Sequence, residues 1–116
     1  MRVAAVDVGT NTTRLLVAEA APGGYRDLDR RLSFTRLGEG VDARGRLREE
    51  AVRRTLGALA DFCAIAGELG VERLRIAGTS ALRVAANPEA FVEPARRLAG
   101  VEPEILPGDE EARLSF

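Results

Sequence analysis

The sequence predicts an α/β domain built on a five-stranded mixed β-sheet of order 3-2-1-4-5 with helices packed on it. Three observations lead to this fold class. A valine-rich stretch opens the chain (2–8), a second apolar stretch follows after a short turn (13–20), and helical periodicity then alternates with strand-like segments. Helices join the first, fourth and fifth strands, so these three should be parallel.

The first three strands are predicted to form a meander. Residues 2–8 are almost wholly apolar, which indicates a strand buried on both faces. A turn at residues 9–11 leads into the second strand over 13–20, and Pro-Gly-Gly at 22–24 marks the next turn. The third strand is expected over residues 25–37, and the glycine-rich residues after it predict a loop.

Helices and short strands then alternate. A helix is predicted over 47–69, because apolar residues recur there at spacings of four and three: Val52, Leu56, Leu59, Cys63 and Ala66. A fourth strand ends near Gly78. Asn87 is interpreted as the cap of a helix over 88–99, with an inner face formed by Phe91, Ala95 and Leu98. Pro103 makes residues 101–106 an edge strand, and a last helix begins after Gly108.

Composition excludes several functional classes. The 116 residues are enough for one domain with one core, and the net charge of -1 argues against nucleic-acid binding by bulk charge, although it leaves room for local basic clusters. All 17 basic residues are arginine, which is typical of a codon-biased genome; the alternative is selection for binding phosphate. The chain has no histidine and one cysteine, Cys63, which we interpret as core packing; Ser-His-Asp catalysis, histidine metal sites and internal disulfides are therefore excluded. Without a signal peptide or an apolar run of ~20 residues, a cytoplasmic protein with no membrane partner is expected.

Three polar segments follow the carboxyl ends of the predicted parallel strands: residues 7–12, 78–83 and 107–111. The topology switches at the first strand, and ligands of such sheets bind outside the carboxyl ends at this switch. We therefore expect the three segments to meet at one edge of the sheet and to form the functional site.

Each segment has a functional and a purely structural interpretation. Asp7 suits a Mg²⁺ ligand or a capping acceptor for turn amides equally well. Gly9, Thr10, Asn11 and Thr12 could cradle phosphate, although an ordinary hairpin turn favours the same residue types.

The later segments leave similar alternatives open. Arg83, near Thr79 and Ser80, is either a bidentate phosphate ligand or a solvated arginine. Glu110 and Glu111 either complement the dipole of the last helix or orient a water molecule.

Four stretches together resemble the exopolyphosphatase / guanosine pentaphosphate phosphohydrolase (Ppx/GppA) family: DVGTNTTRLLVAE, RLGEGVD, GTSALRVAANPEAF and PGDEEARLSF. The resemblance runs colinearly along the whole chain and implies an actin-like, ribonuclease-H-like fold. It also implies Mg²⁺-assisted, in-line attack of water on the terminal phosphate of inorganic polyphosphate or guanosine pentaphosphate.

The resemblance further implies a role for each candidate residue. Asp7 would be associated with the metal, residues 9–12 would form the first phosphate loop, and Arg83 with Ser80 would bind phosphate. Glu111 would be the catalytic glutamate that positions or activates water.

One departure from the family concerns domain organisation. Family members carry a second, similar domain with a D-x-G-G-G-S loop, and this sequence contains no such loop. We therefore expect residues 1–116 to be a single domain, the N-terminal half of a two-domain actin-like phosphatase, and to be inactive or weakly active alone. Its uncovered interdomain surface would allow a homodimer. The competing hypotheses are the ATPase half of an actin-fold sugar kinase and a non-enzymatic phosphate- or nucleotide-binding module.

Overall fold

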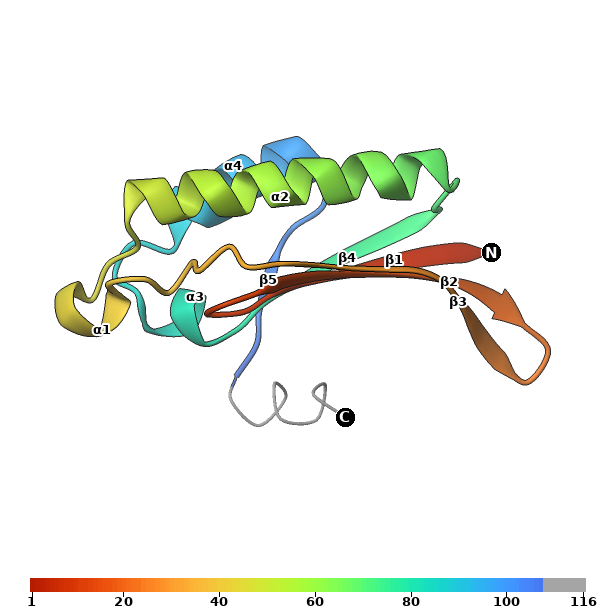
Figure 1. The fold of residues 1–116 in the computed structure, drawn as a ribbon, viewed down its shortest axis with the longest axis horizontal. Helices are drawn as coiled ribbons and strands as arrows, with labels where there is room; N and C mark the ends of the chain where they lie inside the picture. The colour runs from red at the N-terminus through yellow and green to blue at the C-terminus, as the bar shows by residue number, and fades with distance from the viewer. Residues whose placement is uncertain (108–116) are drawn as a thin grey trace.

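The computed structural model describes residues 1–107 and contains the predicted five-stranded sheet, in the order β3-β2-β1-β4-β5 (Figure 1). The strands are β1 (Arg2–Val8), β2 (Thr13–Ala21), β3 (Gly24–Ser33), β4 (Arg73–Gly78) and β5 (Glu104–Ile105). The helices are α1 (Val41–Arg44), α2 (Glu49–Glu68), α3 (Ser80–Val84) and α4 (Glu89–Ala99). The last predicted helix lies outside the described residues.

Strand pairing confirms the predicted topology. β1 pairs antiparallel with β2 and parallel with β4, while β4 pairs parallel with β5. β1 is therefore the strand at which the connections change direction, and its carboxyl end is the topological switch. In the described part of the chain, none of the helices has the length and apolarity needed to cross a membrane.

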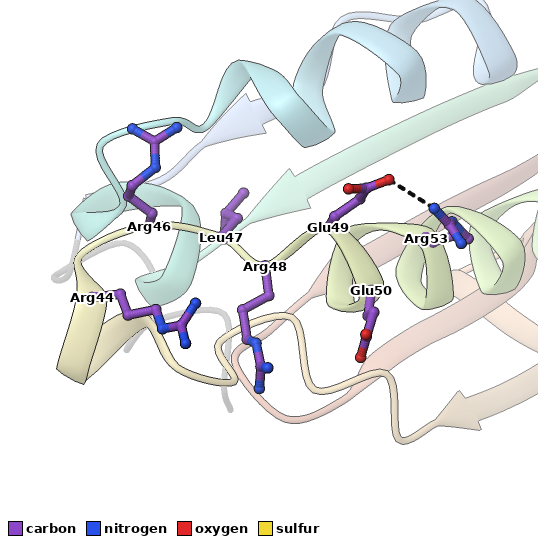
Figure 2. A pocket seen from close by; sticks show the side chains of 7 residues that line it. All are labelled: Arg44, Arg46, Leu47, Arg48, Glu49, Glu50 and Arg53. Carbon is purple, nitrogen blue, oxygen red and sulfur yellow. Dashed lines mark hydrogen bonds and ion pairs between the residues drawn. The ribbon is translucent and has the colours of Figure 1, made fainter.

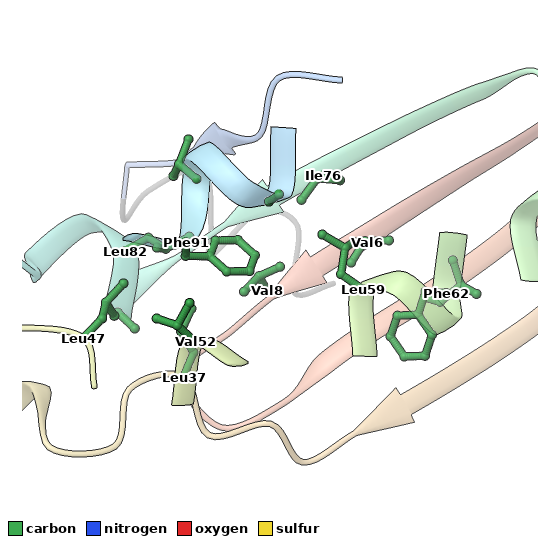
Figure 3. Close-up of a cluster of buried hydrophobic side chains, with 14 of the residues drawn as sticks. Val6, Val8, Leu37, Leu47, Val52, Leu59, Phe62, Ile76, Leu82 and Phe91 are labelled. Carbon is green, nitrogen blue, oxygen red and sulfur yellow. The ribbon is translucent and has the colours of Figure 1, made fainter. Parts of the chain in front are cut away.

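The core lies between the sheet and the helices α2 and α4, which both run across the same side of it (Figure 1). The strands β1, β2 and β4 and all four described helices contribute side chains to this core, several of which are drawn in Figure 3: Val6, Val8, Leu59, Ile76, Leu82 and Phe91. We call this side of the sheet the covered face and the opposite side the open face.

The prediction that β1 is buried on both faces is wrong. Its side chains alternate, so that Ala4, Val6 and Val8 are buried whereas Ala5 and Asp7 are exposed. Among residues 1–107 the long helices cover only one face, which leaves the other side of an apolar strand open. The valine content of β1 was therefore not sufficient to predict how much of the strand is buried.

The helices are rotated relative to the predicted apolar stripes. In α2 the buried set includes Thr55 and Phe62, while Leu56 and Cys63 are only half-buried at the border of the core. In α4, Leu98 was predicted to be buried but is 42% exposed. Val92, which was not predicted, is buried instead. Packing against the sheet sets which side of each helix is buried, and several of the predicted positions lie next to the true stripe.

Asn87 does not cap α4 as predicted. Its Oδ1 accepts a hydrogen bond from the backbone N–H of Leu47 at 2.7 Å, and its Nδ2 donates to the Leu47 carbonyl at 3.3 Å. The side chain thus mimics a strand partner for the segment before α2, and Pro88 occupies the N-cap position instead.

The remaining differences concern element boundaries. β3 ends at Ser33 rather than at residue 37, β5 is shorter than predicted, and α2 begins after Arg48. The short helix α1 stands where the sequence predicted a loop, and the short helix α3 lies in the segment after the fourth strand, for which no helix was predicted. Each has too few residues for a helical period to be recognised.

Candidate functional site

The described ends of the predicted site segments meet at the carboxyl ends of β1 and β4. The carbonyl of Val8 accepts hydrogen bonds from the backbone N–H of Thr79 at 3.1 Å and from its hydroxyl at 3.2 Å. Leu106 N–H donates to the Gly78 carbonyl at 2.9 Å, so the chain after β5 reaches the same edge. Glu110 and Glu111, the predicted water-orienting residues, lie outside the described residues.

The loop at residues 9–12 directs its carbonyl groups into the protein. The Thr12 carbonyl accepts from Gly9 N–H at 2.9 Å, the Thr10 carbonyl from Gly38 N–H at 2.9 Å and the Asn11 carbonyl from Arg36 N–H at 3.0 Å. In residues 1–107, by contrast, no protein acceptor pairs with the backbone N–H groups of Thr10, Asn11 and Thr12. A loop with satisfied acceptors and consecutive unused donors is suited to binding an anion.

The segment after β3 holds this loop in place. A Cβ atom on Gly38 would overlap the side chain of Thr10, so only glycine lets the two backbones approach this closely. The buried hydroxyls of Thr13 and Thr35 lie 2.7 Å apart and form a second link. Arg36 adopts a φ of 51°, the left-handed region, which turns its N–H toward Asn11. This support was not predicted from the sequence, although the glycine within RLGEG was a signal for a close approach of two backbones.

Arg83 and Ser80 both belong to α3, beside the loop. Arg83 Nη1 donates to the Leu106 carbonyl at 2.9 Å and so joins α3 to the chain after β5. Ser80 is the first residue of α3 and is half-buried. One of the five N–H donors of Arg83 therefore has a structural task, which the sequence did not indicate.

Asp7 projects from β1 on the open face. It is exposed, so the sequence argument from the cost of burying a carboxylate does not apply within the described chain. Its direct neighbours across the sheet are Arg14 on β2 and Ala77 on β4. Together with Leu16 and Arg75 they line a hollow of about 550 Å³. The sequence analysis missed Arg14, although the register of the predicted hairpin places it opposite Asp7.

The prediction that Asp7 binds Mg²⁺ can be compared with the possible metal ligands that the described residues supply. Among the described residues no group of three His, Cys, Asp or Glu side chains gathers, so this part of the chain contains no all-protein metal cage. Asp7 supplies one carboxylate at the site edge. Mg²⁺ is usually held by one or two carboxylates together with substrate phosphates, and a single aspartate fits that mode of binding.

The structure is an α/β domain that has three consecutive backbone N–H groups without a protein acceptor, among residues 1–107, at the switch point of its sheet. Comparison with known proteins identifies its family: a sequence model of the Ppx/GppA phosphatase family matches residues 16–116. The chain therefore belongs to the Ppx/GppA phosphatase family.

Individual relatives support this family assignment. Exopolyphosphatase 2 of Mycobacterium tuberculosis is 41% identical over 124 aligned positions, which cover 99% of this chain and 39% of that protein. Guanosine-5'-triphosphate,3'-diphosphate pyrophosphatase of Photobacterium profundum is 33% identical and covers 97% of this chain and 23% of that protein. The Aquifex aeolicus Ppx/GppA family member has a similar structure, with a TM-score of 0.91, 34% identity, and coverage of 97% of this chain and 37% of that one. The chain thus spans less than two fifths of these relatives' length.

Proposed function

We propose that this chain is the phosphate-binding N-terminal part of an enzyme that hydrolyses the terminal phosphoryl group of inorganic polyphosphate or guanosine pentaphosphate. The observation that carries the proposal is the loop at residues 9–12: the carbonyls of Thr10, Asn11 and Thr12 are used inside the protein, whereas the amides of the same three residues have no protein acceptor among residues 1–107. The names of the two sequence relatives, an exopolyphosphatase and a guanosine pentaphosphate-type pyrophosphatase, support the same two substrates.

In this proposal the residues divide the work of binding and orientation. In the loop of residues 9–12, the backbone amides of Thr10, Asn11 and Thr12 hold phosphate oxygens. The guanidinium of Arg83, with the Ser80 hydroxyl, approaches from α3. Asp7 would hold Mg²⁺, which neutralises phosphate charge when bound. Glu111 accepts a proton from water or orients it for in-line attack on the terminal phosphorus.

The family match favours a phosphohydrolase over the ATPase half of a sugar kinase. A binding module without turnover remains the alternative for the chain when it acts alone, because the relatives are more than twice as long. The second domain with its own phosphate loop, the cytoplasmic location and self-association stay predictions. Sedimentation of the 116-residue chain at rising concentration tests the last of these.

Steady-state phosphate release by the longest natural protein that contains this chain tests the proposed roles. Glu111→Gln should lower turnover by roughly 10²–10⁴, because a general base is lost, with little change in substrate binding. Asp7→Asn should raise the Mg²⁺ concentration needed, and Arg83→Ala should mainly raise KM. Glu72→Gln is the matched control, since Glu72 is exposed and precedes β4 at the far end of the sheet. Near-normal turnover of Glu111→Gln at saturating substrate would leave Glu111 as a helix-dipole residue only.

A further inference from the structure

Arginines gather where α1 leads into α2. Arg44, Arg46, Arg48 and Arg53 line a hollow of about 380 Å³, with Leu47, Glu49 and Glu50 (Figure 2). We call these four arginines and the space between them the arginine hollow. Residues 36–54 contain six arginines and four acidic residues, whereas the rest of the chain is acidic overall. The hollow is thus a local basic surface on a chain whose net charge is -1.

Much of this positive charge is not neutralised by the protein. Arg53 pairs with Glu49 at 2.8 Å. Arg48 lies 3.6 Å from one carboxylate oxygen of Glu39, while the other accepts a hydrogen bond from Arg54 at 2.5 Å that holds the Glu39 pKa below its ordinary value. Two arginines therefore share this one carboxylate. Within residues 1–107 no acidic side chain lies within ion-pair distance of Arg44 or Arg46, and both are exposed.

The arginine hollow borders the segment that supports the loop at residues 9–12. The Arg48 side chain lies over Gly40, with Cδ 2.9 Å from the position that a Cβ atom on Gly40 would take. Two residues earlier, Gly38 packs against Thr10. A ligand that extends from the loop past residues 38–40 would therefore meet the guanidinium group of Arg48 first.

The guanidinium groups are spread out and do not converge on one point. Arg46 extends from one side of the chain, while Arg44 and Arg48 extend from the other (Figure 2). A single compact phosphate cannot contact all of them, but a flexible chain of phosphates can. The lining contains no aromatic side chain on which a nucleobase could stack. These features favour a linear polyanion without bases over a nucleotide or an RNA strand.

We propose that the arginine hollow binds the distal phosphates of linear inorganic polyphosphate whose terminal phosphate lies at the loop of residues 9–12. Guanidinium groups bind phosphate oxygens in pairs, and each contact releases counterions from the polymer. The inference rests on the proposed function and deepens it, because it selects the polymer over the guanosine nucleotide as the substrate class.

Binding of phosphates of different length to the 116-residue chain tests the inference. The wild-type chain should bind long-chain polyphosphate more tightly than tripolyphosphate. Arg44→Ala/Arg46→Ala should weaken long-chain binding roughly tenfold and reduce the slope of log Kd against log salt by about one per arginine, with tripolyphosphate affinity within about twofold of wild type. Arg73→Ala/Arg97→Ala is the matched control, because both arginines are exposed, lie outside the hollow and leave the same net charge. This control should bind both ligands like wild type.

Three outcomes would overturn the inference: equal weakening by the two double variants, no gain in wild-type affinity with chain length, or equal binding of a single-stranded RNA of similar charge. Circular dichroism of both variants checks that the fold is retained. Failure of the proposed function is seen separately, as the absence of phosphate release from polyphosphate and from guanosine pentaphosphate by the longer protein. If affinity did not depend on chain length but Glu111→Gln still reduced turnover, the arginine hollow would not be a polyphosphate site, while the proposed phosphohydrolase function would stand.

Discussion

The covered and open faces of the sheet are made by the same strands but differ in composition. On the covered face Val6 lies opposite Leu15 and Ile76, and all three are at most 2% exposed. One residue along, the open face carries a row that runs from Leu32 through Arg14 and Asp7 to Ala77. The next row on that face, Arg30-Leu16-Ala5-Arg75, has an arginine at each end.

This difference means that the covered face stabilises the fold, whereas the open face carries the charged side chains next to the candidate site. The apolar side chains of the covered face exclude water and contribute the burial that holds the sheet to α2 and α4. The charged side chains of the open face contribute little burial, but they stand beside the carboxyl end of β1, where the loop of residues 9–12 begins. We expect substitutions on the two faces to differ in the same way.

Matched leucine truncations should show the largest contrast. Leu15→Ala removes a side chain that is 2% exposed and should lower the free energy of unfolding by about 2–5 kcal/mol. Leu32→Ala, at a side chain that is 49% exposed, should change it by only about 0.5 kcal/mol. Urea denaturation of the two variants gives both values. Similar losses would mean that the open face is packed as tightly as the covered one.

Gly38→Ala should have an intermediate effect, concentrated on the site. The new methyl group would overlap Thr10 and displace the loop, which should cost about 1–3 kcal/mol of stability and weaken tripolyphosphate binding roughly tenfold. Calorimetric titration and urea denaturation measure the two effects.

The matched control for that change is Gly57→Ala in α2, where an added Cβ atom has open space around it. Since glycine weakens a helix interior, this variant should gain about 0.5–1 kcal/mol and bind normally. If Gly38→Ala bound tripolyphosphate as well as Gly57→Ala does, the loop of residues 9–12 would not depend on the segment after β3.

The ion pair between Asp29 and Arg31 on β3 should have the smallest effect. The hydrogen bond from Arg31 holds the pKa of the Asp29 carboxyl below its ordinary value. The contribution of this pair to stability is therefore present above the ordinary carboxyl pKa and fades as the pH falls through the lowered one. It should be slight, because Arg31 is exposed to solvent and Asp29 is only partly buried.

An NMR titration measures the Asp29 pKa directly. In Arg31→Ala the value should rise toward that of an ordinary aspartate, while the urea midpoint near neutral pH hardly moves. An unchanged Asp29 pKa in this variant would show that another group is responsible for the shift.

Local patterns in the sequence were enough to predict the order of the sheet and the two long helices. Alternation, glycine and proline breaks and helical spacing are properties of neighbouring residues, and the right-handed crossover rule converts them into a topology. The same rule brought the segments around residues 7–12 and 78–83 to one edge, where the structure places them. The assignment of Glu111 as the catalytic residue came from the family resemblance.

Tertiary structure decided what depends on residues far apart in the chain. Which face of β1 is covered follows from where α2 and α4 pack, so Asp7 is exposed in spite of its apolar strand. Asn87 pairs with Leu47 rather than capping its own helix, because a backbone 40 positions away offers it both a donor and an acceptor. The orientation of the loop of residues 9–12 likewise depends on Arg36 and Gly38, whose N–H groups occupy the carbonyls of Asn11 and Thr10 only once the chain has folded.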